Sequence, residues 1–218
     1  MALSTSSSAS AAGFESEDVE LIKRDSSYQG FFKLDTLHLR HRLFAGGWSP
    51  VFTRELFVRT PAVGVLLYDP ALDNVVLVEQ FRVGALDVSE RSPWLLEIVA
   101  GMIDQGEQAE SVACREALEE AGCMPQNLEH ICDYFSSPGG TSERITLYCG
   151  QVDSNGVGGI HGLPHEHEDI RVCVLSFDEA WSQLQSGFSK LDNAMSIIAM
   201  QWLYIHKEKL RAQWLNEN

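Results

Sequence analysis

Residues 101–123 read GMIDQGEQAESVACREALEEAGC, and this stretch restricts the fold of the chain more strongly than any other. Residues Ala109–Ala121 are rich in Ala, Glu, Arg and Leu and contain neither Gly nor Pro, so they predict a helix. The helix should stop at Gly122, with Pro125 just beyond it. Charged residues and glycines stand at fixed spacings along the whole stretch: Gly101, Glu107, Arg115, Glu116, Glu119, Glu120 and Gly122.

The carboxylates of this helix point to a metal site. Glu116 and Glu120 are four residues apart and therefore share one helix face, which Glu119 flanks. Like charges at this spacing destabilise a bare helix by a few tenths of a kcal/mol, and a divalent cation would reverse that effect. Mg²⁺ prefers carboxylate oxygens together with water and substrate phosphates. The alternative is a solvated acidic helix, but the preceding loop, residues 101–106, and Glu107 favour the metal site.

Composition and charge narrow the class of protein. The chain has 218 residues, of which 44% are hydrophobic, which suits one compact domain with an appendage. Its net charge of −15 argues against nucleic acid and anionic membranes as partners. The five cysteines form no CxxC pair, which favours reduced thiols and a cytoplasmic setting. We find neither a signal peptide nor an apolar run approaching the roughly 18–20 residues of a membrane span.

The chain divides into three predicted parts. Residues 1–17 are rich in Ser and Ala and predict a disordered tail. Residues 18–60 predict a small N-terminal β unit, with strands over 19–22, 31–44 and 51–58 and a turn at Ala45-Gly46-Gly47. Residues 61–218 predict a catalytic domain of α/β class with a mixed sheet. Its expected strands are 62–68, 74–81, 128–135, 144–152 and 170–177, and its expected helices are 109–121, 178–186 and 193–210. Residues 94–100 lead into the loop before the first helix, and residues 153–168 predict a long loop with Gly and His residues.

The spaced positions of residues 101–123 resemble the Nudix box, with Ala117 and Cys123 at two places that are usually bulky and aliphatic. From about Val19 to Gln213 the chain is similar to the bacterial-type ADP-ribose pyrophosphatases of the Nudix superfamily. The motifs that carry this similarity are FFKLDTLHLRHRLF, VVLVEQFR, PWLLEIVAGMI, SPGGTSER, GIHGLPHEHEDIRV and DNAMSIIAMQWL. The resemblance implies a Nudix α/β/α sandwich and a homodimer in which the N-terminal β unit reaches the partner's site.

The resemblance also implies a reaction and a role for each site residue. The reaction is hydrolysis of ADP-ribose to AMP and ribose 5-phosphate, with Mg²⁺ or Mn²⁺ as cofactor and water attacking the diphosphate. Glu166 would be the general base. The metal ligands would be the Ala100 carbonyl, Glu116, Glu119, Glu120 and Glu168. The substrate would contact Phe31, Phe32, Arg54, Glu55, Arg59, Arg82, Met102, Ser137, Pro138, Gly139 and Glu143, with Arg54 and Glu55 supplied by the partner chain.

Alternatives remain at several positions. Without the resemblance, Phe31 and Phe32 on a predicted strand would be assigned to the core. Arg54-Glu55 fits a surface pair equally well, and Arg82 could be a surface residue. The loop histidines, His161, His165 and His167, fit either solvated side chains or a zinc site.

Three other functions compete with ADP-ribose hydrolysis. The same box serves enzymes that cleave other nucleotide sugars, such as GDP-mannose. A non-catalytic ADP-ribose sensor would tolerate loss of the carboxylates, which this chain keeps. An mRNA-decapping role would need a basic RNA-binding face, which the net charge of −15 argues against.

Overall fold

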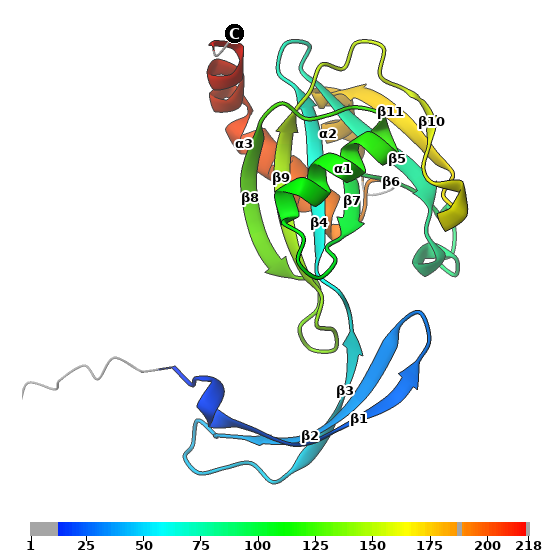
Figure 1. Cartoon of the computed structure of the whole chain (residues 1–218). Helices are drawn as coiled ribbons and strands as arrows, with labels where there is room; N and C mark the ends of the chain where they lie inside the picture. Colours follow the sequence, from blue (N-terminus) through cyan, green and yellow to red (C-terminus); the bar gives the residue numbers. More distant parts are fainter. Residues whose placement is uncertain (1–12, 187–188, 217–218) are drawn as a thin grey trace, which may run out of the picture. The chain divides into compact units, whose positions relative to one another are not determined.

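The structure is a computed structural model that describes residues 13–186 and 189–216 (Figure 1). The described part of the chain forms two compact units. The first contains the residues up to Arg59 together with Gly139–Ser142, and the second contains Thr60–Pro138 and the chain from Glu143 onward. Most of the predicted tail, residues 1–12, lies outside the described residues. Residues Ser16–Asp18, where the predicted tail meets the predicted N-terminal unit, form a short 3₁₀ helix, η1.

The first unit is an antiparallel sheet of three strands, which confirms the predicted small N-terminal sheet. Its strands are β1 (Val19–Gln29), β2 (Lys33–His41) and β3 (Phe52–Val58), in the order β1-β2-β3. The hairpin between β2 and β3 turns at Gly46 and Gly47, whose φ angles of 92° and 79° favour glycine. Phe57 also bonds the loop 139–142, because its N–H donates to the Gly140 carbonyl at 2.8 Å.

The second unit is a three-layer α/β/α sandwich, which confirms the predicted fold class. Its sheet has the order β10-β11-β5-β4-β9-β8, with β6 paired to β5 and β7 paired to β4. The sheet is mixed, because β4 runs parallel to β9 and antiparallel to β5 and β7. The strands are β4 (Ala62–Asp69), β5 (Asn74–Phe81), β6 (Trp94–Glu97), β7 (Val99–Met102), β8 (Leu128–Phe135), β9 (Arg144–Gln151), β10 (Gly159–His161) and β11 (Ile170–Ser176).

The helices cover the two faces of this sheet, as Figure 1 shows. Helix α1 (Ala109–Ala121) buries its apolar side chains against alternate β4 residues such as Val63 and Val65. Helices α2 (Phe177–Gln185) and α3 (Ala194–Asn216) pack on the opposite face. The alternation of β4 therefore gives two apolar cores, one on each side of the sheet. Among the described residues, no helix has the length and apolar character needed to cross a membrane.

Several predicted boundaries were wrong. Residues Phe31 and Phe32 lie in the turn between β1 and β2 and not on a strand. The segment that leads into the loop before α1 forms two strands, β6 and β7, which break at Ile98 and pair with different neighbours. The predicted loop over 153–168 contains β10 and the short 3₁₀ helix η3 (Pro164–Glu166). Helix α3 continues to Asn216, beyond its expected end at residue 210.

Candidate active site

Helix α1 presents the predicted metal-binding carboxylates at the edge of a buried face. Val112, Ala113 and Ala117 anchor the helix on the sheet. Glu120 is only 3% exposed, and the Glu116 side chain is 14% exposed, because both project beside β7 rather than into solvent. The fold therefore holds both carboxylates in a largely buried position on one helix face, as the sequence predicts.

Strand β7 is built to receive these two side chains. A Cβ atom at Gly101 would overlap the Glu116 carboxylate, so only glycine leaves room for it. The Ala100 N–H donates to Glu120 Oε2 at 3.2 Å. The residue predicted to offer a carbonyl to the metal thus contacts one of the predicted carboxylate ligands. The break between β6 and β7 places Ala100 and Gly101 directly against α1.

Arg115 orders the outer carboxylates of the helix. Its Nη1 lies 2.9 Å from Glu116 Oε1 and 3.1 Å from Glu119 Oε2, and its Nη2 lies 3.9 Å from Glu107 Oε2. Glu107 in turn accepts a hydrogen bond from the Asp104 N–H at 3.0 Å. One guanidinium therefore connects the loop before α1 with the helix, which explains the spacing of Arg115 from Glu107.

The two inner carboxyl groups resist ionisation when no cation is bound. Burial raises the pKa of Glu116 to about 7, with the Glu119 and Glu168 carboxylates adding to the rise and Arg115 opposing it. Burial likewise raises the pKa of Glu120 to about 8, with Glu116 and Glu168 adding to the rise. A nearby divalent cation would favour the charged forms. Glu168 thus acts electrostatically on both groups, although it lies far from them in sequence.

The donor set fits a hard cation such as Mg²⁺. Within residues 13–186 and 189–216, no three His, Cys, Asp or Glu side chains converge into a complete metal site. Mg²⁺ is commonly held by one or two carboxylates, with water and substrate phosphates filling the other positions. Glu116 and Glu120 supply such a pair, and the zinc site considered for the loop histidines gains no support. His161 instead places Nε2 2.9 Å from the Gly158 carbonyl.

The loop before β11 carries Glu166 and Glu168 in different surroundings. Glu168 Oε2 accepts a hydrogen bond from the Leu163 N–H at 3.0 Å, which folds this side chain back into the loop. Glu166 ends η3, and its side chain is 56% exposed beside His165. The structure therefore places Glu168 near the helix carboxylates and leaves Glu166 in solvent.

The loop is attached to the end of helix α1. The Gly162 N–H donates to the Glu119 carbonyl at 3.3 Å. Gly122 adopts a left-handed conformation with φ of 66°, and a Cβ there would overlap the His161 ring. The imidazole of His161 thus packs where Gly122 has no side chain. These contacts link helix α1 to the loop that carries Glu166 and Glu168.

The predicted substrate residues are distributed over both units. In the first unit, Phe31 is 84% exposed, so its alternative assignment to the core is wrong. The Arg59 guanidinium lies over the Phe32 ring, 4.6 Å from its centroid. Arg54 and Glu55 are neighbours on β3 and point to opposite faces of the sheet. Gly139 is the remaining predicted substrate residue in this unit.

The second unit contains the other predicted substrate residues, namely Arg82, Met102, Ser137, Pro138 and Glu143. Met102 ends β7 and is 44% exposed. The loop that holds Ser137 and Pro138 is closed by a hydrogen bond from the Ser136 N–H to the Glu143 carbonyl at 3.2 Å. Arg82 follows β5 and acts electrostatically on Glu120, which places it near the helix carboxylates.

Sequence reasoning missed the partner of Arg82. Glu97 is a buried acid on β6, and its Oε2 accepts a hydrogen bond from Arg82 Nε at 2.6 Å. Its other oxygen accepts from Asn193 Nδ2 at 2.6 Å. A signal was present in PWLLEIVAGMI, where one acidic residue interrupts an apolar strand pattern. The identity of its partners could not be read from that pattern.

Comparison with known proteins places this geometry in a family. The model of the NUDIX domain matches residues 58–194. The ADP-ribose pyrophosphatase of Escherichia coli K12 is 49% identical over 201 residues, covering 92% of this chain and 95% of that protein. The protein of the same name from Haemophilus influenzae is 46% identical over 203 residues, covering 92% of this chain and 93% of that protein.

More distant relatives carry other names. A GDP-mannose pyrophosphatase from Pectobacterium atrosepticum is 33% identical over 152 residues, covering 68% of this chain and 75% of that protein. A solved structure described as an ADP compounds hydrolase has a TM-score of 0.66 at 18% identity, covering 90% of this chain and 96% of that chain. This likeness shows the fold alone. The matched domain, together with the extent and identity of these relatives, shows that the chain belongs to the Nudix family.

Proposed function

We propose that this protein hydrolyses ADP-ribose to AMP and ribose 5-phosphate in a Mg²⁺-dependent reaction. The observation that carries the proposal is the buried pair Glu116 and Glu120, seated against Ala100 and Gly101. ADP-ribose as substrate is supported by relatives named ADP-ribose pyrophosphatase, which are 46% and 49% identical over more than nine-tenths of this chain.

The metal would be held by Glu116, Glu120 and the Ala100 carbonyl, with Glu119 and Glu168 as further oxygen donors. Once bound, a divalent ion neutralises charge on the diphosphate and makes water more acidic. Arg115 keeps the Glu116 carboxylate oriented, since it bonds this group and Glu119 together. Arg82 lies near Glu120 and offers a guanidinium to a phosphate oxygen.

Glu166 would accept the proton of the attacking water. Its side chain is exposed at the end of η3, so it would turn toward helix α1 to take this proton. Glu168 is already hydrogen-bonded within the loop, which leaves it less free for proton transfer. The proton acceptor and the metal-binding group therefore lie two residues apart on one loop.

The adenosine half would be bound by the first unit. Phe31 offers an exposed ring for stacking, and Phe32 and Arg59 lie together beside it. The sheet of this unit also exposes Leu21, Ile22 and Tyr28. A three-stranded sheet needs another surface to bury an apolar face, and a second copy would supply it through a C₂ interface. We therefore include a homodimer with shared sites in the proposal.

A product analysis tests the substrate and the metal together. The purified protein is incubated with ADP-ribose, GDP-mannose and other nucleoside diphosphate sugars, in Mg²⁺, in Mn²⁺ and in excess EDTA. AMP and ribose 5-phosphate should form fastest from ADP-ribose with metal, and EDTA should stop the reaction. Faster cleavage of GDP-mannose would favour the function of the relative that is 33% identical.

A pair of variants tests the site. Glu120→Gln should lose most activity, whereas Glu110→Gln, an exposed carboxylate on the same helix, should remain active. Near-normal turnover of Glu120→Gln in Mg²⁺ would rule out the assigned metal site.

A further inference from the structure

Glu97 is a buried carboxylate that the proposed chemistry does not use. It is 5% exposed at the end of β6, and both of its oxygens are hydrogen-bonded. Arg82 Nε donates to Oε2 at 2.6 Å, and Asn193 Nδ2 donates to Oε1 at 2.6 Å. Buried carboxylates are rare unless they are paired, so this group has a fixed relation to Arg82.

Asn193, the second partner of Glu97, lies directly before helix α3. Asn193 Oδ1 accepts a hydrogen bond from the Ser196 N–H at 2.8 Å. The buried Ser196 Oγ accepts one from the Ile98 N–H at 3.1 Å, directly after Glu97. The Glu97 carboxylate therefore cannot move without disturbing both α3 and the junction of β6 and β7.

Arg82 is hydrogen-bonded to one carboxylate and acts electrostatically on another. Its hydrogen bond goes to Glu97, but its charge also acts on Glu120, whose pKa is lowered by Arg82 against the larger effect of burial. The Glu120 carboxylate accepts a hydrogen bond from the Ala100 N–H. If Glu97 lost its charge, the Arg82 guanidinium would still be attracted to the Glu120 carboxylate. A guanidinium bound to Glu120 would occupy oxygens that a cation needs.

We propose that Glu97 is a positioning residue that holds Arg82 away from Glu120 and so keeps the Glu120 carboxylate available to a divalent cation. Asn193 fixes the carboxylate of Glu97 for this purpose. The inference rests on the metal site of the proposed function. It adds that a residue outside the metal site sets the affinity of the site for its ion, by fixing the position of an arginine.

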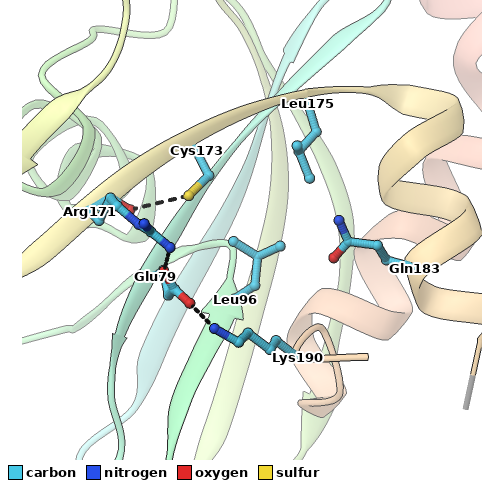
Figure 2. A pocket seen from close by; sticks show the side chains of 7 residues that line it. All are labelled: Glu79, Leu96, Arg171, Cys173, Leu175, Gln183 and Lys190. Carbon is cyan, nitrogen blue, oxygen red and sulfur yellow. Dashed lines mark hydrogen bonds and ion pairs between the residues drawn. The ribbon is translucent and has the colours of Figure 1, made fainter. Parts of the chain in front are cut away.

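The chain offers a matched control in Glu79, shown in Figure 2. Glu79 lies on the neighbouring strand β5, is 8% exposed and accepts from Arg171 and Lys190. The Lys190 carbonyl also accepts from the Leu96 N–H at 3.0 Å, so this acid ties down the same segment before α3. Among the described residues, the ion pairs of Glu79 go to Arg171 and Lys190 and not to Arg82. Glu79 borders a cavity of about 190 Å³, which is lined also by Leu96, Arg171, Cys173, Leu175, Gln183 and Lys190.

The test measures Mn²⁺ binding to the full chain without substrate, from the electron paramagnetic resonance signal of free Mn²⁺. The proteins are wild type, Glu97→Gln, Glu79→Gln, Arg82→Ala and the double variant Arg82→Ala/Glu97→Gln. Glu97→Gln should bind Mn²⁺ about 10-fold more weakly, the usual size of an effect from a group that supports a metal ligand. Glu79→Gln should bind as wild type does. The double variant should bind as Arg82→Ala does, since no guanidinium remains to compete.

Each result decides between the possibilities. No Mn²⁺ binding by wild type would overturn the metal site and this inference together. Wild-type affinity in Glu97→Gln would overturn the inference alone. The inference would also be overturned if Glu97→Gln weakened Mn²⁺ binding equally in the wild-type and Arg82→Ala backgrounds. Glu97 would then support the site by holding the local structure and not by positioning Arg82. Circular dichroism checks folding, and if Glu97→Gln does not fold, Asn193→Ala with and without Arg82→Ala gives the same comparison with a smaller weakening.

Discussion

The raised pKa of Glu116 predicts how the metal-free protein responds to pH. The group titrates near 7 in the folded chain and near its ordinary 4.5 in the unfolded chain. The folded protein therefore binds this proton more tightly, so the stabilisation is complete below pH 4.5 and is lost as pH rises through 7. At about 1.4 kcal/mol per pKa unit, this carboxyl group makes wild type lose roughly 3 kcal/mol of unfolding free energy by pH 8.5.

Urea unfolding at pH 5.5, 7.0 and 8.5 in EDTA measures the part of this loss that falls within that range, about 2 kcal/mol. Glu116→Gln lacks the titrating group, so its unfolding free energy should fall less than that of wild type over the same range. Excess Mg²⁺ should stabilise wild type more at pH 8.5 than at pH 5.5, because the ion favours the ionised carboxylate. Glu110→Gln serves as the control, since the lowered pKa of Glu110 confines its titration to more acidic solutions. An equal fall in wild type and Glu116→Gln would refute the reasoning.

Three further predictions follow from the site. Glu166→Gln should lower kcat by about 10²–10⁴-fold with little change in KM, whereas Glu168→Gln should be partly restored by added Mg²⁺; steady-state kinetics over a Mg²⁺ series would show whether the roles are reversed. Gly101→Ala should displace the Glu116 carboxylate and abolish most activity while the far-ultraviolet spectrum stays unchanged; full activity would contradict the close fit. Co-refolding Arg54→Ala with Glu120→Gln should return about a quarter of wild-type activity, since half of the dimers are mixed and each has one intact site; no recovery despite mixed dimers would place the whole site in one chain.

Local signals in the sequence predicted the parts of the fold that depend on near neighbours. The bounds of α1 were correct because its residues favour a helix and Gly122 ends it within one turn. The bounds of β5 and β8 were correct, because β5 is a mostly apolar run after the Asp69-Pro70 turn and β8 ends just before the turn that begins at Ser137-Pro138. The shared face of Glu116 and Glu120 follows from helical spacing alone.

Contacts between distant residues could not be predicted in this way. The break at Ile98 arises because β6 pairs with β5 while β7 pairs with β4, and neither partner is visible in the local pattern. The bonds that join Arg82, Glu97 and Asn193 connect three separate segments. Phe31 lies in a turn because β1 and β2 pair up to Gln29 and Lys33, a register that the sequence between them does not specify.

Gly122 meets two separate requirements: it adopts a left-handed backbone, and it leaves room for the His161 ring. Asparagine tolerates the left-handed backbone and often replaces glycine at the end of a helix. At position 122, however, any side chain would collide with the imidazole of His161. Asparagine could thus preserve the end of α1 and still push the loop with Glu166 away from the helix. An engineer who moves this helix to another scaffold must therefore leave an empty space beside its last residue as well as a flexible backbone.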